Sequence, residues 1–145
     1  HDILQHHEFQ PSRALGNLPM GLAAHLVDSA VDGAPATLSK PVMDWIRQDI
    51  GFDGLIMTDD IAMKALIGDL GDLSRAALSA GCDVILHCNG TLDERRLVAE
   101  AAGQMTDAAQ TRATAARAAR RTPDEIDISA CDAELEALTG GGPNG

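Results

Sequence analysis

The sequence predicts an α/β domain built on a parallel sheet. Three short apolar runs begin near residues 20, 54 and 82. These runs lie about 30 residues apart, which is the spacing of repeated βα units. Segments with apolar residues at helical spacing separate them. Because three strands alone would leave both edges of the sheet open, we expect the chain to form about three βα units of a larger barrel.

Length and composition exclude several classes of function. The 145 residues suffice for one domain with a core, but they fall short of the roughly 250 of a complete (β/α)8 barrel. The 11 Lys and Arg residues against 22 Asp and Glu residues give a net charge of -11. This balance argues against nucleic acid or an anionic membrane as a partner. No apolar run approaches the roughly 20 residues of a membrane span.

The cysteines and the N-terminal histidines predict neither a disulfide framework nor a metal site. Cys82, Cys88 and Cys131 are odd in number and lack C-x-x-C spacing, so we expect small buried thiols in a reducing compartment. His1, His6 and His7 are the other metal candidates, but adjacent histidines point apart on any regular element. We therefore expect residues 1–15 to be a solvated linker or a helix end.

The first strand is expected at Pro19–Val27, where the residues are small and apolar. His25 lies near its C-terminal end, where the side chain either faces a pocket or, as the favoured alternative, is held in the core by hydrogen bonds. Ser39 is then expected to cap a helix that has Pro41 in its first turn and that ends before Gly51.

The central strand, Leu55–Thr58, is followed directly by the carboxylates of Asp59 and Asp60. Open α/β sheets and barrels place their chemistry at the C-terminal ends of their strands, so Asp59 is the first candidate for a catalytic residue. Asp60 is expected to cap a short helix, Ile61–Leu66. From spacing alone, a double helix cap is favoured over a catalytic role for this pair.

The last strand is expected at Cys82–Leu86 and is again followed by polar groups, His87 and Asn89. Further helices are expected at 73–80 with Asp72 as cap, 93–102, 106–121 and 128–138. Four arginines between 112 and 121 are interpreted as a solvated helix face rather than an anion site. We expect residues 1–121 to form the barrel portion and residues 122–145 to form a C-terminal helix and a flexible tail.

The stretch DGLIMTDDIAM, residues 53–63, resembles the signature of family 3 glycoside hydrolases. The closest likeness is to the bacterial β-N-acetylglucosaminidases that trim cell-wall fragments in the cytoplasm. The resemblance extends through residues 18–25, 35–39 and 81–90, and it covers roughly residues 8 to 105. It implies a partial (β/α)8 TIM barrel in which the three strands are the sixth, seventh and eighth.

In that family the first aspartate of the pair is the catalytic nucleophile. This corresponds to Asp59 and reverses the preference for a helix cap. The resemblance implies a retaining mechanism with a covalent glycosyl intermediate, without a metal or a cofactor. We expect neighbouring donors, such as the Thr58 hydroxyl or backbone N–H groups, to stabilise the ionised carboxylate. His87, Asn89 and His25 are candidates for contacts with the substrate.

The resemblance also shows what the chain lacks. The family's acid/base histidine lies in a K-H-x-P-G-H-G…D-S-H motif, which this sequence does not contain. We therefore expect the isolated chain to be weak or inactive. The expected partners are a small carbohydrate with terminal N-acetylglucosamine and the missing N-terminal part of the barrel, in the cytoplasm. Two alternatives remain, namely another family 3 activity such as a β-glucosidase, and a non-catalytic half-barrel remnant.

Overall fold

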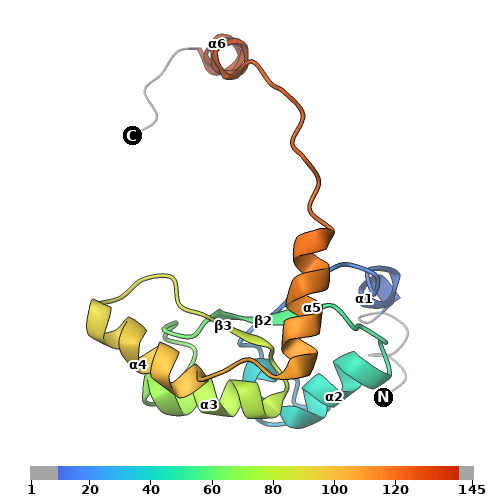
Figure 1. Cartoon of the computed structure of the whole chain (residues 1–145), viewed down its shortest axis with the longest axis vertical. Coiled ribbons are helices and arrows are strands. Elements are labelled where there is room, and N and C mark those ends of the chain that lie inside the picture. The colour runs from blue at the N-terminus through green and yellow to red at the C-terminus, as the bar shows by residue number, and fades with distance from the viewer. Residues whose placement is uncertain (1–9, 141–145) are drawn as a thin grey trace.

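A computed structural model describes residues 10–140 of the chain. The elements are α1 (Gln10–Ala14), β1 (Met20–Ala23), the 3-10 helix η2 (Ala36–Leu38), α2 (Lys40–Gln48), β2 (Leu55–Asp60), α3 (Leu70–Ala80), β3 (Val84–Leu86), α4 (Leu92–Ala102), α5 (Asp107–Ala118) and α6 (Ile128–Thr139). Strands and helices alternate from β1 to α4, as predicted (Figure 1). His1, His6 and His7 and residues 141–145 of the expected tail lie outside the described residues.

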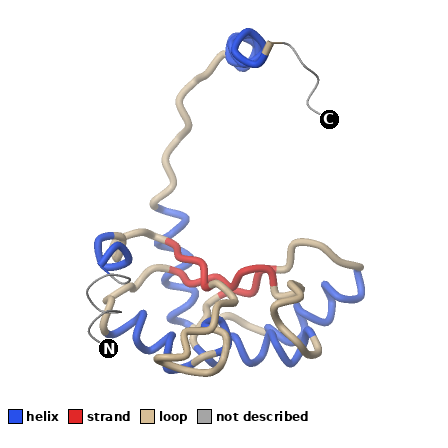
Figure 2. The backbone as a smooth tube through the Cα atoms, turned by 180° about the vertical axis from the view of Figure 1, so that it is seen from behind, coloured by secondary structure: helices blue, strands red, loops and turns tan. Residues whose placement is uncertain are grey.

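The three strands form one parallel sheet in the order β1-β2-β3. The helices α2 and α3, which connect consecutive strands, lie on the same side of the sheet, and α4 packs against α3 (Figures 1 and 2). The predicted small parallel sheet is therefore confirmed. Closure of this sheet into a TIM barrel stays a prediction.

Strand pairing explains which sheet face is buried. Gly21 lies opposite Ile56 and Ala23 lies opposite Thr58, and this face is covered by the connecting helices. The core on this side consists mainly of small and branched side chains, together with one methionine and one phenylalanine: Ala23, Met43, Phe52, Ile56, Ile61, Leu66, Leu73, Ala77, Ala80, Cys82 and Val98. Side chains alternate between faces along a strand, so Met20 and Leu22 point to the other face, where they are 45% and 53% exposed.

Helix caps explain most of the element boundaries. The Ser39 hydroxyl accepts a hydrogen bond from the Val42 N–H at 3.2 Å, which confirms the predicted cap of α2. Helix α3 begins earlier than predicted, because Asp69 rather than Asp72 accepts hydrogen bonds from its first turn. Thr91 caps α4 through a reciprocal pair of bonds with Glu94.

Three predicted elements are shorter or absent. The first strand ends at Ala23 instead of Val27, because the following residues turn away and His25 bonds to groups outside the strand. The helix expected at 61–66 does not form, since β2 continues to Asp60 and a series of turns follows. The last strand begins at Val84 rather than at Cys82.

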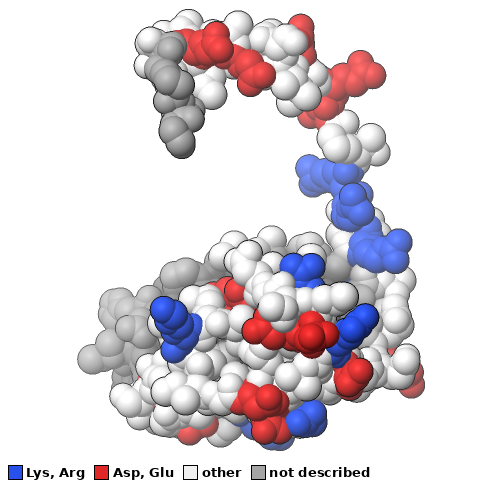
Figure 3. All heavy atoms as spheres, turned by 90° about the vertical axis from the view of Figure 1, so that its left-hand side faces the viewer, with Lys and Arg blue, Asp and Glu red and all other residues white. Residues whose placement is uncertain are grey.

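The C-terminal helices differ in how they contact the sheet. Helix α5 lies against β2 and buries Ala109 and Ala116. Helix α6 buries none of its residues and lies apart from the other elements (Figure 1). Basic side chains gather at the end of α5 and acidic ones around α6 (Figure 3).

Candidate functional site

Polar side chains gather where the parallel strands end, as the sequence predicts. Asp59 and Asp60 close β2, His25 follows β1, and His87 and Asn89 follow β3. The C-terminal ends of parallel strands share one edge of the sheet, so these groups belong to the same end of the fold. Their contacts differ from one residue to the next.

Asp59 is a half-buried carboxylate at an irregular point of the sheet. Met57 lies opposite Val84 and Asp60 lies opposite Leu86, so β2 contains one residue more than β3 over this stretch. Such a bulge re-aims the side chain that it carries. One carboxylate oxygen of Asp59, Oδ1, accepts the Asp60 N–H at 2.8 Å. Among the described residues, no other hydrogen bond to this carboxylate is present.

Of the two kinds of donor predicted for Asp59, a backbone N–H is present and the hydroxyl of Thr58 is not a donor to it. Thr58 is fully buried, and its Oγ1 accepts the Leu86 N–H at 2.9 Å. This bond takes the place of a backbone ladder bond where the bulge interrupts the register. The side chain therefore fastens β3 to β2 immediately before the candidate nucleophile.

His25 is held at both ring nitrogens, as the favoured structural alternative predicts. Its Nδ1 lies 2.8 Å from the Thr37 Oγ1, and its Nε2 lies 2.9 Å from the main-chain oxygen of Asp60. Thr37 is fully buried in η2. A carbonyl oxygen only accepts hydrogen bonds, so Nε2 carries the proton.

Asp60 has a different role from the predicted helix cap. Its Oδ1 accepts the Ala62 N–H at 3.1 Å and the Cys88 N–H at 3.2 Å. The second of these bonds links the end of β2 to the loop after β3. Sequence reasoning missed this link because Cys88 lies 28 residues further along the chain.

His87 and Asn89 occupy different environments. Asn89 is exposed. Both ring nitrogens of His87 are buried and have no hydrogen-bond partner among the described residues. His87 lines a cavity of about 660 Å³ between β3 and the helices α3, α4 and α5. Asp59 does not line this cavity or the hollow of about 300 Å³ beside β1.

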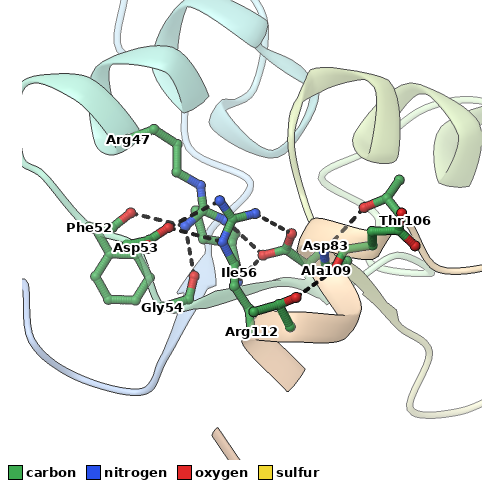
Figure 4. A network of polar contacts seen from close by, with 11 residues as sticks. Arg47, Phe52, Asp53, Gly54, Ile56, Asp83, Thr106, Ala109 and Arg112 are labelled. Carbon is green, nitrogen blue, oxygen red and sulfur yellow. Dashed lines mark hydrogen bonds and ion pairs between the residues drawn. The ribbon is translucent and has the colours of Figure 1, made fainter. Parts of the chain in front are cut away.

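A second polar cluster lies at the opposite end of the strands (Figure 4). Asp83 Oδ2 accepts from Arg47 at 2.7 Å and from the Ile56 N–H at 2.8 Å, and Asp83 Oδ1 pairs with Arg112 at 3.0 Å. Arg112 also contacts Asp53 at 3.1 Å. The prediction that all four arginines lie on a solvated face is therefore wrong for Arg112.

Burial changes the acid–base properties of two groups near this cluster. Desolvation lowers the pKa of Arg47, and the neighbouring Asp83 carboxylate opposes that effect. Desolvation also raises the pKa of the Cys82 thiol to about 12, with a smaller contribution from Asp83. Cys82 is buried as predicted, whereas Cys88 and Cys131 are exposed. The expectation of three buried thiols is therefore wrong for two of them.

The described part of the chain has neither a cluster of metal ligands nor a membrane-spanning helix. Within residues 10–140, no group of three His, Cys, Asp or Glu side chains is arranged to hold a metal ion. None of the helices in this range is both long enough and apolar enough to cross a bilayer.

Comparisons with known proteins agree with this arrangement of strands. The sequence profile of the glycosyl hydrolase family 3 N terminal domain matches residues 3–122. A β-hexosaminidase of Mannheimia succiniciproducens is 42% identical over 84 residues, which cover 56% of this chain and 24% of the relative. A β-hexosaminidase of Bordetella avium is 40% identical over 75 residues, covering 50% of this chain and 21% of the relative.

A solved structure extends the likeness to the fold. The family 3 β-N-acetylglucosaminidase of a Paenibacillus species aligns with a TM-score of 0.65 at 21% identity, over 83% of this chain and 27% of that protein. At this identity the match speaks for the fold alone. The chain spans about a quarter of the length of the two β-hexosaminidases described above.

Proposed function

The chain belongs to glycosyl hydrolase family 3, and we propose that it supplies the nucleophile-bearing part of a retaining β-N-acetylglucosaminidase. The observation that carries this proposal is the carboxylate of Asp59 on a bulge at the C-terminal end of the middle strand. One of its oxygens is held by the Asp60 N–H, which leaves the other without a protein partner among the described residues. A strand end fixes such a group more firmly than a loop tip does.

The proposed reaction proceeds in two displacements. Asp59 attacks the anomeric carbon while an acid outside this chain protonates the departing glycosidic oxygen, so that a glycosyl ester forms on the carboxylate. The same outside group then takes a proton from water, which attacks the anomeric carbon and releases Asp59. The proposed substrate is a terminal N-acetylglucosamine on a cell-wall fragment in the cytoplasm.

We propose further that this chain forms three βα units of a TIM barrel, with other strands completing it. Three features support this proposal. Among the described residues, no strand pairs with the outer edge of β1 or of β3, and the ring nitrogens of His87, which lines the cavity beside β3, have no hydrogen-bond partner. Met20 and Leu22 also leave apolar surface on β1. Additional strands at both edges would cover the apolar surface and satisfy the exposed backbone groups.

A graft tests the proposed function directly. The 84-residue matching segment of the Mannheimia relative is replaced by that of this chain, and hydrolysis of 4-nitrophenyl N-acetyl-β-glucosaminide is measured. We expect turnover by the graft, and a loss of roughly 10³-fold or more in kcat for Asp59→Asn, because the covalent step needs the ionised carboxylate. The matched control, Asp93→Asn, changes a 91% exposed side chain and should leave kcat unchanged.

The other outcomes separate the alternatives. Faster hydrolysis of the 4-nitrophenyl glucoside would identify a β-glucosidase. A folded graft that hydrolyses neither compound would identify a non-catalytic remnant. The isolated 145-residue chain should be inactive, and turnover by it that Asp59→Asn abolishes would overturn the assignment of the acid to a group outside this chain.

A further inference from the structure

We propose that His25 and Asp60 form a positioning relay that fixes the carboxylate of Asp59, rather than contacting the sugar themselves. The relay runs from the 3-10 helix η2, through the imidazole of His25 and the main chain of Asp60, to the Asp59 carboxylate. It rests on the proposed function for its catalytic meaning, but its geometry stands on hydrogen bonds within the described residues.

The first step of the relay is the contact between the hydroxyl of Thr37 and the imidazole of His25. The Thr37 Oγ1 lies 2.8 Å from Nδ1 of His25, 3.0 Å from the carbonyl oxygen of Ala23 and 2.9 Å from that of Ala24. The hydroxyl has a single proton, so it donates to one of these acceptors at a time, and in the Nε2–H tautomer Nδ1 is one of them. These groups belong to the last residue of β1, to the two residues that follow it and to η2. Because Thr37 is fully buried, water cannot replace these bonds without opening the fold. The imidazole is therefore held in one orientation and, by its contact at Nε2, in one tautomer.

The second step is the hydrogen bond from the imidazole of His25 to the main chain of Asp60. The main-chain oxygen of Asp60 accepts from Nε2 of His25 at 2.9 Å and from the Met63 N–H at 3.0 Å, which uses both of its lone pairs. The side chain of Asp60 is held separately by the N–H groups of Ala62 and Cys88. Asp60 is thus fixed by groups from the end of β1, from its own turn and from the loop after β3.

The third step transmits this fixation to the carboxylate. The N–H of Asp60 donates to Oδ1 of Asp59 at 2.8 Å, so the orientation of the Asp60 backbone sets the orientation of the nucleophile. On the other side, Thr58 is fastened to Leu86. The bulge thus has both flanks tied to neighbouring elements. A displacement of about 1 Å at a reacting group is enough to lower a rate by about 10²-fold.

The same contacts argue against a direct sugar contact by His25. Both of its ring nitrogens already have protein partners at 2.8 and 2.9 Å, so the ring has no donor or acceptor left for a hydroxyl group. A substrate hydrogen bond would have to break one of these contacts. His25 is accordingly a positioning residue in this proposal.

Nuclear magnetic resonance of the isolated chain tests the relay without any turnover. In the wild type, we expect the Nε2–H tautomer of His25 in long-range ¹H–¹⁵N spectra. Thr37→Val removes the hydroxyl at nearly constant volume, and Thr37→Ser retains it. Thr37→Val should raise hydrogen exchange at the Asp60 amide by about tenfold and shift the Asp59 carboxyl ¹³C resonance, whereas Thr37→Ser should restore both signals.

A parallel pair of variants acts on the imidazole itself. His25→Phe keeps a ring without hydrogen-bonding groups, and His25→Gln keeps a donor. The first should reproduce the effect of Thr37→Val, and the second should reduce it. The Ile56 amide, which donates to Asp83 at the other end of the strand, should keep its exchange rate in every variant and so reports an intact fold.

Three results would overturn the relay. One is an Nδ1–H tautomer in the wild type. Another is an unchanged Asp59 carboxyl signal in Thr37→Val or His25→Phe while the Ile56 amide stays protected. The last is the loss of Ile56 protection in both variants together with a wild-type imidazole that exchanges freely between tautomers. Failure of the proposed function is distinguishable, because the graft would then lack turnover while these resonances still followed the relay.

Discussion

At the scale of single residues, Asp83 joins four segments of the fold. Its carboxylate contacts Arg47 of α2, the Ile56 amide of β2 and Arg112 of α5, and it lies just before β3. Asp83 is only 6% exposed, so these bonds form away from water. Removal of this buried carboxylate should strongly lower the free energy of unfolding, because the two guanidinium groups and the amide would be left without an acceptor.

We expect Asp83→Ala to lower the free energy of unfolding by about 3–5 kcal/mol, since two partly buried guanidinium groups lose their shared partner. Urea denaturation followed by the fluorescence of Trp45, the only tryptophan, measures this change. The control is Asp93→Ala, whose exposed pair with Arg96 at 3.5 Å should contribute at most about 0.5 kcal/mol. Equal losses in the two variants would contradict a structural role for the cluster around Asp83.

The three cysteines should differ in reactivity. The pKa of about 12 for Cys82 leaves roughly one molecule in 10⁴ as thiolate at pH 8, and the thiolate is the species that alkylating agents attack. Cys88 and Cys131 are exposed. Iodoacetamide at pH 8 should therefore label these two in the folded chain, as mass spectrometry of peptides would show. Cys82 should react only after unfolding in urea, and rapid native labelling of Cys82 would contradict its burial.

At the scale of secondary-structure elements, a glycine fixes how β2 approaches the start of β1. A Cβ atom on Gly54 would lie 2.5 Å from the main-chain oxygen of Leu18 and 2.7 Å from the ring of Phe52. Gly33 is a suitable comparison, because a Cβ there would have no heavy atom within 4 Å. Alanine substitutions at the two glycines therefore distinguish a steric clash at Gly54 from the general effect of adding a methyl group.

Gly54→Ala should lower the free energy of unfolding by about 1–3 kcal/mol, because either the strand or the neighbouring chain must move. Gly33→Ala should be neutral or slightly stabilising, since it restricts the unfolded chain. Thermal unfolding followed by circular dichroism compares the two variants. A loss of stability in Gly33→Ala as large as in Gly54→Ala would show that the close approach at Gly54 is not the cause.

The elements that local chemistry dictates could be predicted from the sequence. Ser39 with Pro41 predicts the start of α2, and the apolar run before Asp59 predicts β2. What escaped prediction depends on distant partners. The link from Asp60 to Cys88 spans 28 residues, and that from Arg112 to Asp53 spans 59. No local spacing encodes such pairs, so the sequence alone predicts a helix cap for Asp60 and solvent exposure for Arg112.

At the scale of the whole molecule, one face of the sheet is covered by helices, and its two outer strands each pair on one side only within the described residues. The helices α2 and α3 cover one face of the sheet, whereas no strand within residues 10–140 pairs with the outer edge of β1 or of β3. The candidate nucleophile lies at the carboxyl end of the middle strand, which is the strand paired on both sides. Its position is therefore defined by residues within this chain. The position of Asp59 can therefore be tested on the isolated chain, whereas sugar hydrolysis is tested on the graft.

The division into residues 1–121 and 122–145 stays a prediction, and truncation tests it. The family profile ends at residue 122, and α6 buries none of its residues. Removal of residues 122–145 should therefore change the free energy of unfolding of the remaining chain by less than about 0.5 kcal/mol, as for exposed positions in general. Urea denaturation monitored through Trp45 in α2 measures the change. A loss of more than about 2 kcal/mol would mean that α6 packs on the sheet-containing body in solution, and the two-part division would then be wrong.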